Sequence, residues 1–417
     1  MSTQFVTGPG PSGGSVAPGT PSRMQRILPL LGSLQGYIGL VLIVLIGAWT
    51  KGNIFFNLNN LTSAVGYFAP RGILAVGMTL VIIAAGIDLS VGALLAVGST
   101  AAAWLLTDQN WPVVAIVPAC MVIGAVFGMV NGAGTALLRI QSFVMTLAMM
   151  TIARGIVREF SGNVSIGTLV LGPGGDIAPG SADFSKLGTP GTSVLGANIP
   201  FLSYFPVLAV VVVVIVFQLV LSKTKFGRHI YAVGGNPTAA RLSGVNVTRV
   251  TIAVFTLSGL LAGLAGPISA AFNASADPVA GTGYELDAIA AVVIGGASLA
   301  GGRGTVVGTF VGALILTLLD NVLGLNNISD NWQLIVKGLI VILAVVIQRP
   351  DLYCDLSAWI SRTFRRGPAD GGGVEEADPL VSNGLEPTRV GAGAAPSLRK
   401  HNDATATSGS GNDSGHP

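Results

Sequence analysis

The sequence predicts an all-α fold, a polytopic membrane helix bundle of about ten transmembrane spans with disordered N- and C-terminal tails. Hydrophobic residues fill 51% of the 417 positions, charged residues fill only 10%, and the mean hydropathy is +0.70. A soluble domain carries about 25% charged residues. The apolar residues also occur in blocks that approach the roughly 20 residues a helix needs to cross a bilayer. Together these observations exclude an ordinary soluble domain.

Both ends of the chain differ from this apolar centre. Residues 1–30 are rich in Gly, Pro and Ser, and residues 367–417 contain no aromatic residue. Such segments bury too little apolar surface to offset the entropy lost on ordering. We therefore expect residues 1–30, and most of residues 351–417, to form disordered cytoplasmic tails around a transmembrane domain at residues 31–350.

Ten apolar segments lie between the tails, judged by span length and pattern. Their approximate ranges are 31–50, 61–86, 89–107, 112–137, 143–160, 204–221, 251–273, 285–300, 304–323 and 333–348. The segments near residues 89 and 285 are short, so we expect them to be tilted, broken or partly re-entrant. Non-helical backbone is tolerated at membrane depth only where protein or a cavity covers it.

The basic residues indicate how the bundle is oriented. When the ten segments are threaded alternately, most of these residues fall on one side, including Arg23, Arg26, Arg139, Lys223, Lys225, Arg228, Arg241, Arg249, Arg349, Arg362, Arg365 and Arg366. Positive residues concentrate in short cytoplasmic loops, so we expect both termini to be cytoplasmic. The net charge of +3 therefore reports topology, and we expect no nucleic-acid partner.

Two connections are longer than the others. The outer one, residues 161–203, has the turn chemistry of an extended surface loop without helix or strand, and a spacer role is favoured over a docking surface. The inner one, residues 222–250, contains "NPTAARLSG". Asn236 suits an N-cap, Pro237 the first helical position and Gly244 the C-terminal stop, which predicts a short cytoplasmic helix. We favour partner contact over simple capping of the bundle as the role of this helix.

Asp88 lies in an apolar stretch flanked by glycines. A charge at the bilayer centre costs about 2.5–3.5 kcal/mol on insertion scales, so the carboxylate should face a cavity, a partner or an interface. We favour a capping role for a helix that begins near Leu89 over direct contact with a transported solute, and a broken helix end can serve both roles. The candidates for the pathway or for a helix break are Gly86, Asp88, Ser90, Gly92, Gly296 and Ser298.

Two other charged residues fall inside apolar segments. Lys337 lies near the outer end of the last segment, where a snorkelling side chain that reaches the interface is the favoured interpretation. Arg71 lies inside the second segment, and the sequence assigns it no role.

Four motifs resemble one family in its order along the chain. They are "GIDLSVG", "GRHIYAVGGNPTAARLSG", "IGGASLAGGRGTVVGTFVGALIL" and "NWQLIVKGLIVILAVVIQR", and they cover most of residues 36–350. Together they resemble the permease subunits of bacterial ABC importers for ribose, xylose and related monosaccharides. Each motif alone is weak, whereas the ordered set is specific.

The resemblance implies a multi-pass subunit of the bacterial cell membrane that moves a monosaccharide inward by alternating access. It implies three protein partners: an ABC ATPase, an extracytoplasmic sugar-binding protein and a second permease copy in a homodimer. The ATPase would dock at the inner loop, at Gly235, Asn236, Pro237, Ala239, Ala240, Arg241, Ser243 and Gly244. The chain has no G-x-x-x-x-G-K-[ST] motif, so we expect no enzymatic or metal site here, with ATP and Mg bound by the partner.

Two other functions stay open at this stage. A branched-chain amino-acid permease of a related importer is the nearest alternative. A secondary transporter working alone is the second, but it would require ion-coupling carboxylates within the spans, and Asp88 alone is thin support.

Overall fold

The structure, a computed structural model, describes residues 23–171, 175–189 and 204–347, all within one compact unit, Met1–Ser357. The predicted tails, apart from residues 23–30, lie outside the described residues. Helices α1–α7 are Arg23–Phe55, Leu58–Ile83, Val91–Thr107, Val113–Ala136, Ser142–Ser161, Pro179–Ser185 and Phe205–Lys223. Helices α8–α13 are Lys225–Gly235, Pro237–Leu242, Val247–Phe272, Tyr284–Ile294, Val306–Leu325 and Asp330–Ile347. The helical membrane fold is confirmed.

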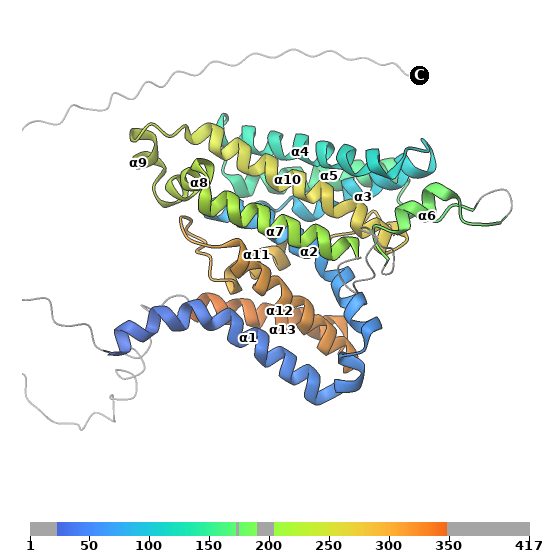
Figure 1. The fold of residues 1–417 in the computed structure, drawn as a ribbon. Helices are drawn as coiled ribbons and strands as arrows, with labels where there is room; N and C mark the ends of the chain where they lie inside the picture. Colours follow the sequence, from blue (N-terminus) through green and yellow to red (C-terminus); the bar gives the residue numbers. More distant parts are fainter. Residues whose placement is uncertain (1–22, 172–174, 190–203, 348–417) are drawn as a thin grey trace, which may run out of the picture. The chain divides into compact units, whose positions relative to one another are not determined.

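Helix α2 lies at the centre of this unit. It packs against α10 and α7 on one side and against α11 and α12 on the other (Figure 1). Its inner residues, such as Ile73, Leu74 and Met78, are completely buried. A helix that is apolar around its whole circumference is typical of such a central position. Helices α3, α4 and α5 lie on the α10 side, and α1 packs on α12.

Helices α4 and α10 approach each other more closely than side chains would allow. A Cβ atom at Gly124 or Gly128 of α4 would collide with the backbone of α10, and one at Gly259 or Gly263 of α10 would collide with that of α4. Small residues spaced four apart allow this close backbone approach in membrane helices, where dispersion contacts drive association. Helices α4 and α10 therefore form one tightly packed side of the bundle.

Each of the ten predicted apolar segments contains one helix. Six described helices are long and apolar enough to cross a membrane: Gly36–Phe55 of α1, α2, α4, α7, α10 and α12. Helix α3, Val91–Thr107, is a shorter apolar helix. Ten spans therefore remain a prediction, and helix α1 begins at Arg23, before the predicted start at residue 31.

The predicted segment 285–300 is only partly helical. Helix α11 ends at Ile294, and at 1.5 Å per residue its 11 residues extend about 16 Å, roughly half of a bilayer core. Residues 295–305 form an irregular loop in which Gly296, Gly301 and Gly302 have positive φ angles. We call this segment the 295–305 loop. The expectation of a broken or short element here agrees with this geometry.

The outer connection contains structure that the sequence did not predict. Strand β1, Ile166–Gly167, pairs antiparallel with β2, Ser275–Ala276, and α6 buries Phe184. The expectation of a loop without helix or strand was therefore wrong for these residues, because their contacts lie with elements far along the chain. Residues 172–174 and 190–203 lie outside the described residues.

Candidate functional site

Asp88 is completely buried in the connection between α2 and α3. Its Oδ1 accepts hydrogen bonds from the backbone N–H of Ser90 at 3.0 Å and from the Ser90 hydroxyl at 2.6 Å. Its Oδ2 accepts a hydrogen bond from the Ser258 hydroxyl of α10 at 2.9 Å. Three hydrogen-bond donors therefore surround this completely buried carboxylate. Such donors offset the free energy cost of removing a polar group from water.

This network continues into two further helices. The side-chain amide of Asn131 on α4 donates to the Ser90 hydroxyl at 2.9 Å. The Thr146 hydroxyl of α5 accepts a hydrogen bond from the Leu89 N–H at 3.1 Å. The Asp88 connection thus joins α3, α4, α5 and α10 through polar contacts.

The contacts of Asp88 differ from those of a simple helix cap. Helix α3 begins at Val91, and the residue before it, Ser90, makes no capping hydrogen bond with its side chain. The Asp88 carboxylate binds the N–H of Ser90 and not the N–H groups within the first turn of α3. Its contact with Ser258 additionally ties the connection to α10.

Three backbone segments meet beside this connection. The N–H of Gly302 in the 295–305 loop donates to the carbonyl of Ile83, the last residue of α2, at 2.9 Å. A Cβ atom at Gly234 of α8 would collide with that same carbonyl. The Tyr231 hydroxyl of α8 donates to the Gly304 carbonyl at 2.7 Å, and burial raises the pKa of Tyr231. Helix α8 is therefore packed directly on the end of α2 and on the 295–305 loop.

Helix α9 follows α8 and has the predicted ends. The Asn236 side chain accepts a hydrogen bond from the Ala239 N–H at 2.9 Å, Pro237 is the first residue, and Gly244 adopts a φ of +84° after the helix. Ala240 is buried within the chain, whereas Leu242 is 86% exposed. Burial of the Leu242 side chain by a partner would therefore be favourable.

A second polar cluster joins α2, α11, α12 and α13. The Arg71 guanidinium donates to Asp320 Oδ2 at 2.8 Å, and Lys337 Nζ lies 2.9 Å from the same oxygen. Lys337 Nζ also lies 3.5 Å from Asp287 Oδ1, and Arg71 Nε lies 3.9 Å from Asp287 Oδ2. The Arg71 guanidinium sits 4.7 Å from the centroid of the Tyr284 ring. We call Arg71, Asp287, Asp320 and Lys337 the charge cluster.

The contacts of the charge cluster correct the snorkelling interpretation of Lys337 and identify partners for Arg71. Lys337 is 14% exposed and pairs with two carboxylates, so it does not act as an unpaired snorkelling residue. Arg71, which had no role in the sequence, is neutralised by the same two carboxylates. Charged groups within membrane bundles usually pair with one another in this way.

A cavity of about 590 Å³ opens beside the charge cluster, between α2, α12 and α13. We call it the polar cavity. Its lining includes Asn60, Arg71, Thr317, Asp320, Asn321 and Gln333. Three of its buried polar atoms lack a hydrogen-bond partner among the described residues, Thr317 Oγ1, Asp320 Oδ1 and Arg71 Nε. A buried polar group left without any partner costs about 1–3 kcal/mol.

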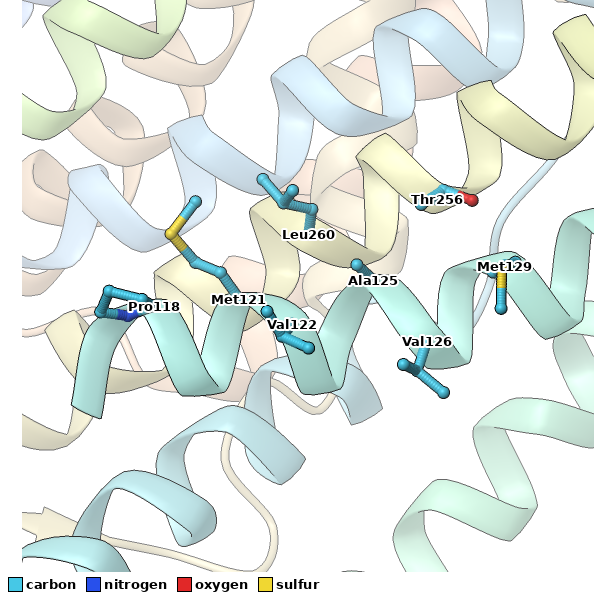
Figure 2. Close-up of a pocket in the computed structure, with 8 residues that line it drawn as sticks. All are labelled: Pro118, Met121, Val122, Ala125, Val126, Met129, Thr256 and Leu260. Carbon is cyan, nitrogen blue, oxygen red and sulfur yellow. The ribbon is translucent and has the colours of Figure 1, made fainter. Parts of the chain in front are cut away.

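An apolar groove of about 340 Å³ lies on the surface of α4 and α10 (Figure 2). Met121, Val122, Val126 and Met129 of α4 line it with Thr256 and Leu260 of α10. The Thr256 hydroxyl already donates to the Ile252 carbonyl at 2.8 Å. The groove therefore suits an acyl chain rather than a polar solute.

The predicted site residues fall into separate places. Gly86 and Ser90 lie in the Asp88 connection, and Gly92 packs against the backbone of Gly281. Gly296 and Ser298 lie in the 295–305 loop, and no described hydrogen bond joins them to Asp88. At the inner loop the exposed residues are Gly235, Asn236, Pro237, Ala239, Arg241, Ser243 and Gly244. Ala240 lies buried and is the exception.

Sequence reasoning missed Leu242 and the partners of Arg71. Leu242 is the one large apolar side chain in "NPTAARLSG", which was a usable signal for an exposed anchor. The partners of Arg71 lie more than 200 residues away along the chain, at Asp287 and Asp320, and no local pattern links them.

A bundle of apolar helices with a polar cavity, irregular backbone between its helices and an exposed short helix defines a multi-pass membrane transport protein. Residues 60–345 match the family described as branched-chain amino acid transport system / permease component, and the chain belongs to this family of transport permeases.

Curated relatives cover most of the chain and nearly all of their own length. The chain is 43% identical to the ribose import permease protein RbsC of Escherichia coli (strain K12) over 313 residues, 75% of this chain and 92% of the relative. It is 40% identical to RbsC of Bacillus subtilis (strain 168), covering 78% of this chain and 93% of the relative. It is 37% identical to the xylose transport system permease protein XylH of Haemophilus influenzae, covering 76% of this chain and 96% of the relative. No solved structure gave a significant match.

Proposed function

We propose that this chain is the membrane permease subunit of an ATP-driven ABC importer for a monosaccharide of the ribose and xylose type. The observation that carries the proposal is the 43% identity to a ribose import permease across 92% of that relative's length. The bundle of apolar helices and the absence of a phosphate-loop motif from the sequence fit a pathway subunit that relies on a separate ATPase.

The sugar proposal is preferred to the amino-acid alternative. The family description names branched-chain amino acids, but the relatives quoted above are named for ribose and xylose. The polar cavity also carries amides, carboxylates and the Arg71 guanidinium, whereas a leucine or valine side chain requires an apolar pocket. A secondary transporter working alone would leave the exposed α9 helix without a role.

The ATPase docks on α9 at the cytoplasmic face, with Leu242 as its apolar anchor. Docking there acts through α8, because Gly234 and Tyr231 contact the end of α2 and the 295–305 loop. Movement of α8 on ATP binding would therefore shift the end of α2 and the 295–305 loop together and change access to the pathway. ATP and Mg bind the ATPase, and this chain holds no cofactor of its own.

The remaining partners complete the importer. An extracytoplasmic sugar-binding protein delivers the monosaccharide to the opposite face, and two copies of this permease form a homodimer in the bacterial inner membrane. Both termini are cytoplasmic in this arrangement, as the distribution of basic residues indicates.

Replacement of Leu242 tests the docking proposal. Leu242→Glu should reduce co-purification of the ATPase in mild detergent by tenfold or more, because losing a buried anchor at an interface costs about 2 kcal/mol or more. Leu242→Met is the matched control and should retain binding, since it preserves the volume and apolar character. The level of each variant in the membrane should stay unchanged, because Leu242 contacts solvent in the isolated chain. Normal ATPase binding by Leu242→Glu would refute the assignment of α9.

A further inference from the structure

We propose that the polar cavity between α2, α12 and α13 is a binding site for an uncharged monosaccharide within a single permease chain. The inference deepens the proposed function and rests on it. The volume of about 590 Å³ lies within the roughly 300–1,000 Å³ typical of small-molecule sites. Sugar hydroxyl groups each donate and accept hydrogen bonds, and the cavity offers both kinds of partner.

The buried polar atoms of the lining that lack a partner favour a ligand with hydrogen-bonding groups. Thr317 is 4% exposed, and its hydroxyl has no partner among the described residues. Asp320 Oδ1 accepts no hydrogen bond, and Arg71 Nε donates none, although Arg71 Nε lies within ion-pair distance of Asp287 and Asp320 Oδ2 pairs with Arg71. Rotation of the Thr317 side chain toward the cavity would bring its hydroxyl to a donor–acceptor group such as a sugar hydroxyl and leave the existing ion pairs in place.

The charge balance of the charge cluster favours a neutral ligand beside it. The charge cluster contains two cations and two carboxylates, so its formal charge is zero, and Asp330 adds one further carboxylate elsewhere in the cavity lining. A charged solute would have to displace a member of this cluster to be neutralised, whereas an uncharged sugar adds hydrogen bonds and leaves the pairs in place. A zwitterionic amino acid would compete for Arg71 and Asp320 with its own charges.

The lining also supplies an aromatic face and a fixed frame. Tyr67 lines the cavity, and its ring is held edge-to-face against Phe272 at a centroid distance of 4.9 Å. Asn60 and Asn321 exchange two hydrogen bonds of 3.1 and 2.8 Å, which join α2 to α12 in the cavity wall. Amide and carboxylate groups held rigidly can pair with neighbouring sugar hydroxyls, while the ring covers the C–H face.

Cysteine protection tests the site directly. In the full chain in lipid nanodiscs, with Cys120→Ala and Cys354→Ser as background, Ser63→Cys, at an exposed position of the cavity lining, should react with a small methanethiosulfonate reagent. Ribose or xylose should slow this reaction several-fold and saturably, while leucine should not. Thr282→Cys, in an exposed loop, is the control whose rate should not respond to sugar. If Ser63→Cys is inert, or reacts at a rate that neither sugar changes, the site proposal is wrong.

Binding of tritiated ribose and xylose provides a second readout. Thr317→Val removes the hydroxyl at nearly constant volume, and it should weaken binding of the transported sugar by about fivefold. Thr317→Ser keeps the hydroxyl and should bind nearly as tightly as the natural chain. Equal binding by Thr317→Val and Thr317→Ser would overturn the proposal. ATP-driven sugar uptake that persists without protection of Ser63→Cys would reject this site and leave the proposed function intact.

Discussion

The carbonyl oxygen of Ile83 accepts a 2.9 Å hydrogen bond from the backbone N–H of Gly302, which joins the end of α2 to the 295–305 loop. Gly234 of α8 lies against the same carbonyl. A helix outside the spans is thereby connected to the end of α2 and to the 295–305 loop, which are more than 200 residues apart in the sequence. This junction is one route by which a partner on α9 can influence the bundle.

Gly234 and Gly235 form a matched pair for testing the junction. A Cβ atom at Gly234 would collide with the Ile83 carbonyl, whereas one at Gly235 would meet open space. We expect Gly234→Ala to lower the free energy of unfolding by about 1–3 kcal/mol, as overpacking does, and to reduce transport. Gly235→Ala should change neither. Thermal unfolding in detergent measures the difference, and equal melting temperatures for the two variants would argue against a tight junction.

Asp88 provides a second prediction. Asp88→Asn keeps an oxygen that accepts from Ser90 and gains an amide that donates to the Ser258 hydroxyl, so it should fold and transport. Asp88→Leu removes the acceptor of three hydrogen bonds and should lower the free energy of unfolding by roughly 3 kcal/mol. Size-exclusion profiles after heating report the stability of both variants. Loss of transport in a stable Asp88→Asn protein would show instead that the charge itself is required.

The charge cluster predicts a rescue. Arg71→Met leaves two carboxylates facing Lys337 alone, and it should lower the free energy of unfolding by up to about 3 kcal/mol. Adding Asp320→Asn restores a neutral cluster, so the double variant should be more stable than Arg71→Met. Melting temperatures in detergent check the order. A double variant less stable than Arg71→Met would mean that Arg71 and Asp320 do not compensate each other.

The topology is testable with cysteines placed at exposed positions in a Cys354→Ser background. A cysteine at Thr238 of α9 should react with an impermeant maleimide only after the membrane is breached, whereas one at Asp183 of α6 should react in intact cells. Ser181 is unsuitable for this test because it is buried. Labelling of the Asp183 position only in broken cells would reverse the orientation.

The helices were predictable from the sequence because span length and apolar composition are local properties. Ten segments were placed, each contains a helix, and the ends of α9 follow from Asn236, Pro237 and Gly244. The irregular 295–305 loop was anticipated only as a short or broken element. Its path depends on contacts with Ile83 and α8, which are distant in the sequence.

The polar contacts were not predictable to the same extent. Asp88 was identified as unusual, but its bond to Ser258 requires α10 to lie beside the connection. The snorkelling interpretation of Lys337 was wrong because its neighbours Asp287 and Asp320 come from other helices. Ala240 was assigned to the partner surface, yet the fold buries it and exposes Leu242. Pairing across helices is set by the tertiary arrangement, which local patterns do not encode.

ATP-driven uptake by the reconstituted importer tests the central claim most directly. Proteoliposomes that contain this permease, its ATPase and its binding protein should accumulate tritiated ribose or xylose only when ATP is supplied to the ATPase. Excess unlabelled sugar should compete, and excess leucine should have no effect. Accumulation of labelled leucine without accumulation of either sugar, or sugar accumulation that is independent of ATP, would contradict the account.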